Sequence, residues 1–233
     1  MENSILITII SDNNLEYIKK AILEIQNFEK VDLLIIDDGS DYNIFNEIKD
    51  FKLVKCISHS DPSGYGACLS AAFVFARDFN YKYLITISPE ENGFIKDIPN
   101  IIDNLDYGYD IITCSRILEN TNYCKINENT LDIYEKLSIN LSDVTAIDIT
   151  DPLSPNKGYN INNIGALELT DESYGVLLQL FIQSSYFGYN IIEIPAESGS
   201  SFGNELNLYD EPLDTFNIII EAEKYLYDKG SIN

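Results

Sequence analysis

Short apolar runs alternate with longer segments in which apolar residues recur at helical spacing. The apolar runs that we expect to form strands are residues 5–10, 33–36, 53–57, 83–87, 110–114 and 189–194. The segments that we expect to form helices are residues 15–28, 42–51, 67–78, 99–105, 131–141, 174–187 and 213–227. Repeated strand and helix in this order predicts an α/β fold with a parallel, doubly wound sheet.

Two segments are too polar or too rich in turn residues for this pattern. Residues 118–129 are rich in Asn, which predicts a surface excursion, and residues 151–158 carry two Pro, Asn and Gly, which predicts a loop. Neither segment has the composition of a linker between domains, and the chain has no internal repeat. We therefore expect a single domain over residues 1–233.

The second expected strand ends on adjacent polar residues, Asp37-Asp38-Gly39-Ser40. Two neighbouring carboxylates repel each other, so a ligand such as a ribose, a base or a metal ion beside them would explain the pair. Ligands of parallel sheets bind at the carboxyl ends of the strands, where Asp12 and residues 88–91 also fall. The alternative is a plain turn, because Asp, Gly and Ser are all turn residues.

The chain is strongly acidic. It has 233 residues, and 38 Asp and Glu against 15 Lys and Arg give a formal net charge of −23. Repulsion from this charge argues against nucleic acid or an anionic membrane surface as a partner. It also opposes binding of a nucleoside diphosphate, unless a metal ion or a local basic residue offsets it.

The cysteines and the single histidine indicate neither a zinc site nor a disulfide framework, because no Cys-x-x-Cys pair occurs. Cys56, Cys68 and Cys114 have apolar or small neighbours and are interpreted as core thiols, whereas His59 and Tyr65 are interpreted as packing or surface groups. No positively charged leader and no apolar run of membrane-spanning length is present. We expect a soluble, cytoplasmic protein.

Several motifs in order resemble the family 2 inverting glycosyltransferases of GT-A fold, most closely the branch of dolichyl-phosphate mannose synthase and polyprenyl-phosphate sugar transferases. The motifs that carry the resemblance, spread over residues 5–208, are Ile35-Ile36-Asp37-Asp38-Gly39-Ser40, Gly64-Tyr65-Gly66-Ala67, Tyr83-Leu84-Ile85-Thr86-Ile87 with Lys96-Asp97-Ile98-Pro99, Ile112-Thr113-Cys114-Ser115-Arg116, and Gly188-Tyr189-Asn190-Ile191-Ile192-Glu193-Ile194-Pro195. One such match would be weak, but several in sequence order are hard to obtain by accident.

The resemblance implies a Rossmann-like, three-layer α/β/α sandwich with a mostly parallel central sheet. It implies a nucleotide-binding half (about residues 1–117) and an acceptor-side half (about residues 118–233). It implies that a UDP- or GDP-linked sugar binds and that the sugar is displaced at its anomeric carbon with the help of Mg²⁺ or Mn²⁺. The residues it assigns to nucleotide-sugar binding are Asp12, Asp37, Asp38, Gly39, Gly64, Gly66, Ser88 and Arg116. The metal ligands would be Glu90 and Glu91, and no catalytic residue is assigned.

The metal and phosphate motifs depart from the family pattern. The Asp-x-Asp metal motif reads Ser88-Pro89-Glu90, so its first carboxylate is missing. The loop that offers cations to the phosphates in the family reads Ser200-Ser201-Phe202-Gly203-Asn204-Glu205-Leu206, and both cations are missing. Gln179 stands where an acidic residue is common. Arg116 suits a phosphate but would equally suit a surface pair with a carboxylate, and Lys157 is a second candidate cation.

These observations leave two hypotheses open. The first is a glycosyltransferase that moves a sugar to a lipid phosphate, such as a polyprenyl phosphate, or to another acceptor, and that associates with a membrane through a partner if at all. The second is a catalytically silent member that acts as a scaffold or regulatory partner, because its charge-stabilising groups are lost together. A nucleotidyltransferase is less favoured, since no Gly-rich loop with Lys or Arg follows the first strand.

Overall fold

The computed structural model describes residues 4–11, 13–52, 54–88, 94–118, 126–197, 206–207 and 209–228. Its strands are β1 (Ile5–Ser11), β2 (Val31–Asp37), β3 (Val54–Ser58), β4 (Tyr83–Ile87), β5 (Ile111–Ser115), β6 (Lys157–Asn160) and β7 (Ile191–Pro195). Its helices are α1 (Leu15–Ile25), α2 (Ile44–Ile48), α3 (Tyr65–Asp78), α4 (Phe94–Tyr107), α5 (Glu128–Thr145), α6 (Val176–Phe187) and α7 (Pro212–Asp228).

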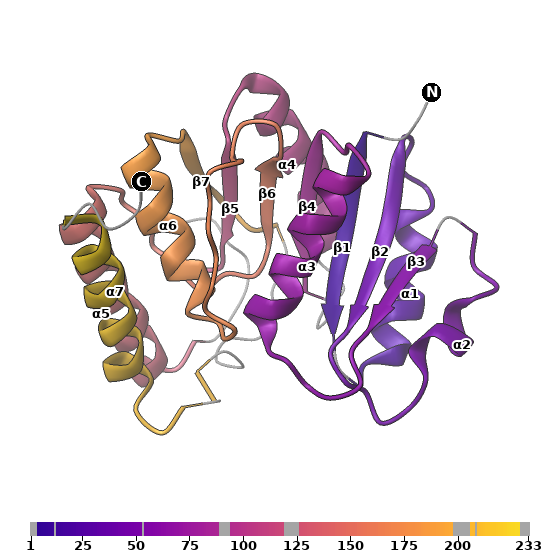
Figure 1. The fold of residues 1–233 in the computed structure, drawn as a ribbon, viewed down its shortest axis with the longest axis horizontal. Coiled ribbons are helices and arrows are strands. Elements are labelled where there is room, and N and C mark those ends of the chain that lie inside the picture. Colours follow the sequence, from indigo (N-terminus) through magenta and orange to yellow (C-terminus); the bar gives the residue numbers. More distant parts are fainter. Residues whose placement is uncertain are drawn as a thin grey trace.

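The strands form one sheet in the order β3-β2-β1-β4-β6-β5-β7, which Figure 1 shows from the side of α3 and α6. All pairs are parallel except those of β6, which runs antiparallel to both β4 and β5. The mostly parallel α/β prediction is therefore confirmed. Ser11 lies opposite Asp37, and Asp37 lies opposite Ser58, so the carboxyl ends of β1, β2 and β3 meet at one edge.

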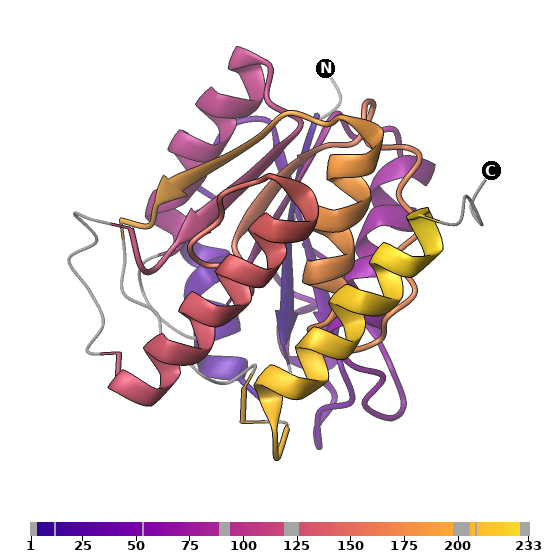
Figure 2. The same cartoon turned by 90° about the vertical axis from the view of Figure 1, so that its left-hand side faces the viewer.

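Helices cover both faces of the sheet. Alternate residues of β1 show this: Ile7 and Ile9 pack in the core with α1, α2 and α4, whereas Leu6 packs in the core with α3 and α6. A strand buried on both sides needs apolar residues at every position, which explains the continuous runs in the sequence. α5 and α7 pack against α6 in a third apolar cluster and lie side by side in Figure 2.

Residues 157–160 were expected to be partly loop and instead form β6, which is a correction to the sequence prediction. The strand is short and polar in composition, yet Lys157 and Tyr159 are fully buried. Gly158 shows how closely the strand packs against α4, because a Cβ there would lie 2.2 Å from Ile101 Cγ2. Residues 157–160 therefore form a strand because they fit between β4 and β5, and this tertiary packing overrides their low strand propensity.

α4 begins earlier than expected and contains Pro99 in its interior. Proline at this position removes a backbone donor. Ile98, Ile101 and Leu105 are at most 1% exposed and lie on one helical face, so burial of this stripe outweighs the lost hydrogen bond. Among the described residues, no helix has both the length and the apolar character needed to cross a membrane.

Candidate functional site

The candidate site lies where β1, β2 and β3 end. The sheet ladder continues one residue past the strands, with Asp38 N donating to Ser11 O at 3.0 Å and His59 N donating to Asp37 O at 2.9 Å. This ladder fixes Asp37 and Asp38 at the carboxyl edge, as the sequence predicted. The two carboxylates have different surroundings, because Asp37 is buried and Asp38 is partly exposed.

Asp38 is held by four donors. Ser63 N (2.7 Å), Ser63 Oγ (2.8 Å) and His59 Nδ1 (3.1 Å) meet Oδ1, and Gly64 N (2.9 Å) donates to Oδ2. Burial raises the pKa of Asp38, but the hydrogen bonds from Ser63, His59 and Gly64 outweigh it, and the pKa is lowered overall. The carboxylate is therefore ionised at neutral pH and ties β2 to the start of α3.

Asp37 organises the turn that follows β2. Its Oδ1 accepts from Ser40 N at 3.0 Å, and Ser40 Oγ accepts from Asn13 N at 2.8 Å. Asn13 Oδ1 accepts in turn from Asp41 N at 2.9 Å. These bonds join the loops after β1 and β2 beside an open depression, which is lined by Asn13, Asn14, Leu15, Glu16, Tyr17, Tyr42 and Glu47.

The three predicted glycines admit close backbone contacts. Gly39 has φ +83°, and a Cβ there would lie 2.6 Å from Pro62 N. Gly64 has φ +93°, and a Cβ on Gly66 would lie 1.9 Å from the carbonyl oxygen of Asp171. Gly66 N also donates to Glu172 O at 2.9 Å. Steric fit alone requires these glycines, so their contact with a nucleotide stays a prediction.

Ser88 follows β4 directly, and its N donates to Asn156 Oδ1 at 2.8 Å. Asn156 is fully buried, and its Nδ2 has no partner among the described residues. The loop before β6 thus supports the point where the predicted metal motif begins. Asp12, Glu90 and Glu91 lie outside the described residues, so the predicted metal ligands stay predictions.

Arg116 lies inside the protein and not on its surface. Its side chain is 2% exposed, with Nε donating to Asp151 Oδ2 at 2.7 Å and Nη2 to Asp151 Oδ1 at 2.8 Å. Nη2 also donates to Tyr134 OH at 3.1 Å. The loop that carries Asp151 is fixed by Glu193, which accepts from the backbone N of Asp151 at 2.9 Å. A phosphate would have to compete with Asp151 for this guanidinium.

Lys157, the second candidate cation, is also enclosed. Its Nζ donates to Thr113 Oγ1 at 3.0 Å and to Ser154 O, and it lies 5.0 Å from the centre of the Phe181 ring. Burial lowers the pKa of Lys157 to about 7, with the nearby Asp151 acting in the opposite direction. Both candidate cations therefore have partners in the protein interior.

Gln179 belongs to a buried network that brings in an acid from another helix. Its Oε1 accepts from the backbone N of Thr170 and Asp171, and its Nε2 donates to Glu223 Oε1 of α7 at 2.6 Å. Burial raises the pKa of Glu223. This pairing could not be predicted from the sequence, because 44 residues separate the two partners.

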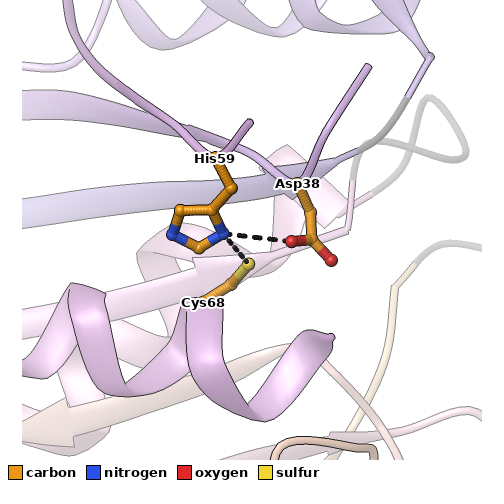
Figure 3. A group of neighbouring side chains, drawn as sticks. All are labelled: Asp38, His59 and Cys68. Carbon is orange, nitrogen blue, oxygen red and sulfur yellow. Dashed lines mark hydrogen bonds and ion pairs between the residues drawn. The ribbon is translucent and has the colours of Figure 1, made fainter. Parts of the chain in front are cut away.

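A further group that the sequence did not reveal is formed by Asp38, His59 and Cys68. One ligand atom of each lies within 4.8 Å of the other two, and Figure 3 shows the three side chains pointing toward one another. His59 was interpreted as a packing or surface group and Cys68 as a core thiol. Cys68 is indeed buried, as is Cys114, whereas Cys56 is partly exposed. The signal in the sequence is weak, since each residue comes from a different element.

No family model and no curated protein sequence matches the chain. Among solved structures, the chain is similar to glucosyl-3-phosphoglycerate synthase from Mycobacterium tuberculosis in complex with Mn²⁺, UDP-glucose and phosphoglyceric acid, with TM-score 0.72, 14% identity and coverage of 95% of this chain and 80% of that one. The complex of the same enzyme with Mn²⁺, UDP and glucosyl-3-phosphoglycerate gives TM-score 0.68 and 15% identity, with coverage of 97% and 79%.

The chain has a GT-A fold. At 14% to 15% identity, the similarity to these structures establishes the fold and leaves the activity to be tested. The similarity extends over 95% of the chain. The closer relationship to the dolichyl-phosphate mannose synthase branch stays a prediction.

Proposed function

We propose that this protein is a glycosyltransferase that uses a UDP- or GDP-linked sugar as donor. The observation that carries the proposal is the similarity over 95% of the chain to a synthase solved with Mn²⁺ and UDP-glucose, combined with Asp37 and Asp38 at the carboxyl end of β2. Ligands of open α/β sheets bind at this edge. Asp38, ionised and partly exposed, is suited to accept hydrogen bonds from a ribose or a base.

The transfer is a displacement at the anomeric carbon. An acceptor oxygen bonds to that carbon, the bond from the carbon to the phosphate oxygen breaks, and the nucleoside diphosphate leaves with the electron pair. Mg²⁺ or Mn²⁺ would carry the charge of the leaving group, with Glu90 and Glu91 as its proposed oxygen ligands. Asp12, Gly39, Gly64, Gly66 and Ser88 would line the donor site.

We propose an acceptor that carries a phosphate. The family resemblance suggests a polyprenyl phosphate, and the structurally similar synthase was solved with phosphoglyceric acid. An ionised phosphate oxygen attacks without losing a proton, whereas a hydroxyl on a phosphorylated acceptor needs a base, to which we assign no residue. Transfer assays with undecaprenyl phosphate and with 3-phosphoglycerate separate the two acceptor types.

A catalytically silent protein is the second candidate. The observation that favours it is that Arg116, expected at the phosphates, is enclosed by Asp151 and Tyr134. Loss of charge stabilisation at a leaving diphosphate costs orders of magnitude in rate. Donor turnover by the purified protein with Mn²⁺, above a blank without protein, would reject this candidate.

The proposal is tested by calorimetric titration of the protein with UDP-glucose and GDP-mannose in the presence of Mn²⁺. We expect binding of one of these donors at a single site and at least about 10-fold weaker binding by Asp38→Asn, because a carboxylate that accepts hydrogen bonds is replaced by an amide. Asp41→Asn, an exposed position in the same turn, is the matched control and should bind normally. Absence of binding to both donors would refute the proposal.

A further inference from the structure

Asp38, His59 and Cys68 offer three different metal-ligand chemistries at one point. A carboxylate oxygen, an imidazole nitrogen and a sulfur come from the end of β2, the residue after β3, and the first turn of α3. A mixed set with sulfur and imidazole is typical of zinc, whereas Mg²⁺ and Mn²⁺ prefer oxygen ligands alone. The chemistry thus differs from that of the metal proposed for the donor diphosphate.

The spacing of His59 Nδ1 from the other two ligand atoms suits one tetrahedral ion. His59 Nδ1 lies 3.1 Å from Asp38 Oδ1 and 3.7 Å from Cys68 Sγ. With the usual zinc–ligand bond lengths, the edges of a tetrahedron are about 3.3 Å between N and O ligands and about 3.6 Å between N and S ligands. These two separations therefore need only small adjustments to receive the ion, and the ligand atoms of Asp38 and Cys68 lie within 4.8 Å of each other.

The carboxylate is fixed before any ion arrives. Backbone donors Ser63 N and Gly64 N hold Asp38 from the helix side, in the way that outer partners orient metal ligands. Ser63 Oγ contacts both His59 Nδ1 and Asp38 Oδ1, so a hydroxyl lies beside two of the ligand atoms. Cys68 is fully buried, but the side chains of His59 and Asp38 are 25% and 15% exposed, which leaves a path from solvent.

We propose that Asp38, His59 and Cys68 bind one zinc ion, with a water molecule or the Ser63 hydroxyl as fourth ligand. Binding would replace the thiol proton of Cys68, which passes to solvent. The proton on His59 Nδ1 would be lost to solvent as well, and the neutral imidazole would carry its proton on Nε2 instead. The ion would join β2, the loop after β3 and α3. The proposal does not depend on the glycosyltransferase activity, because it concerns metal binding by the protein without any nucleotide.

The test is a titration of the metal-free protein with Zn²⁺ in competition with a chromophoric chelator. We expect one ion per chain, and binding at least about 100-fold weaker for Cys68→Ser and for His59→Gln, since losing a ligand costs more than losing an outer partner. Cys56→Ser is the matched control, because Cys56 is a free thiol on neighbouring β3 outside the cluster. It should bind zinc as the unaltered protein does.

Co²⁺ gives a second readout that reports on the ligands themselves. A sulfur-to-cobalt charge-transfer band should appear with the unaltered protein and with Cys56→Ser, and should be absent with Cys68→Ser. Circular dichroism of each variant shows whether it is folded. Absence of one-to-one binding by the unaltered protein, or equal zinc affinity in folded Cys68→Ser and Cys56→Ser, would overturn the proposal.

Discussion

At the residue scale, the buried ion pair of Arg116 and Asp151 joins two segments that lie far apart in the chain. Arg116 follows β5, and its partner is 35 residues away in a loop that Glu193 orders. Both side chains are almost completely removed from water, so each charge depends on the other for its stabilisation.

We predict that Asp151→Ala lowers the free energy of unfolding by about 3–5 kcal/mol, because it leaves the Arg116 guanidinium buried without its carboxylate. Urea denaturation followed by circular dichroism measures the change. Asp132→Ala is the control: it breaks the exposed pair with Lys136 and should change the stability by less than about 1 kcal/mol. Equal effects of the two substitutions would contradict the assignment of Arg116 and Asp151 as a buried ion pair.

Asp97 on α4 should make stability depend on pH. The residue is 1% exposed, Oδ1 accepts from Glu197 N at 2.6 Å, and Oδ2 has no partner among the described residues. Burial raises the pKa of Asp97 from 3.8 to about 7, the hydrogen bond from Glu197 opposes this, and the charge of Glu197 adds to it. The folded protein therefore binds a proton that the unfolded chain has already lost.

The direction in which stability changes with pH follows from this difference in proton binding. The contribution of Asp97 to stability is complete below about pH 4 and is lost as the pH rises through about 7. We predict that Asp97→Asn removes this loss and is more stable than the unaltered protein above about pH 7, by an amount of order 1–3 kcal/mol. Thermal unfolding at several pH values checks this, with exposed Asp103→Asn on the same helix as control. If the stabilities of the two variants changed with pH in the same way, the result would be inconsistent with the burial of Asp97.

At the element scale, the sequence predicted the parallel strands but missed β6. The parallel strands β1, β2 and β4 are continuous apolar runs, which hydrophobic patterning reveals. β6 has the sequence Lys-Gly-Tyr-Asn and forms a strand because it fits between β4 and β5. The candidate site has the same division: the carboxylates at the end of β2 were found, whereas the grouping of His59 with Asp38 and Cys68, which come from other elements, was not.

The start of α3 gives a prediction at this scale. Alanine normally stabilises a helix relative to glycine by about 1 kcal/mol. At Gly66 the expected effect is reversed, because the added Cβ would lie 1.9 Å from Asp171 O and the segment around Glu172 would have to move. We predict that Gly66→Ala destabilises the protein by about 1–3 kcal/mol in urea denaturation.

Gly165→Ala is the matched control for this substitution. No atom lies within 4 Å of a Cβ built at Gly165, and its φ is not in the left-handed region. The stability of the Gly165→Ala protein should therefore stay unchanged or rise slightly, because alanine restricts the unfolded chain more than glycine does. An increase in stability for Gly66→Ala would show that the contact with the 171–173 segment is not tight.

At the scale of the whole molecule, the dominant property is the net charge of −23. Arg116 and Lys157, the described cations expected near the donor phosphates, are both neutralised or enclosed by the interior. A metal-free nucleoside diphosphate approaching the carboxyl edge thus meets a repulsive long-range field. The same field does not act on an uncharged nucleoside.

This contrast between a nucleoside diphosphate and an uncharged nucleoside allows the proposed donor site to be tested by changing the salt concentration. Raising NaCl from about 10 mM to about 150 mM shortens the screening length from about 30 Å to about 8 Å, which weakens the repulsion. We predict that UDP, titrated calorimetrically in the presence of a chelator, binds several-fold more tightly at the higher salt concentration. Uridine, which would bind through the nucleoside end alone, should show no change. Weaker UDP binding with added salt would mean that a local cationic group outweighs the net charge at the phosphates.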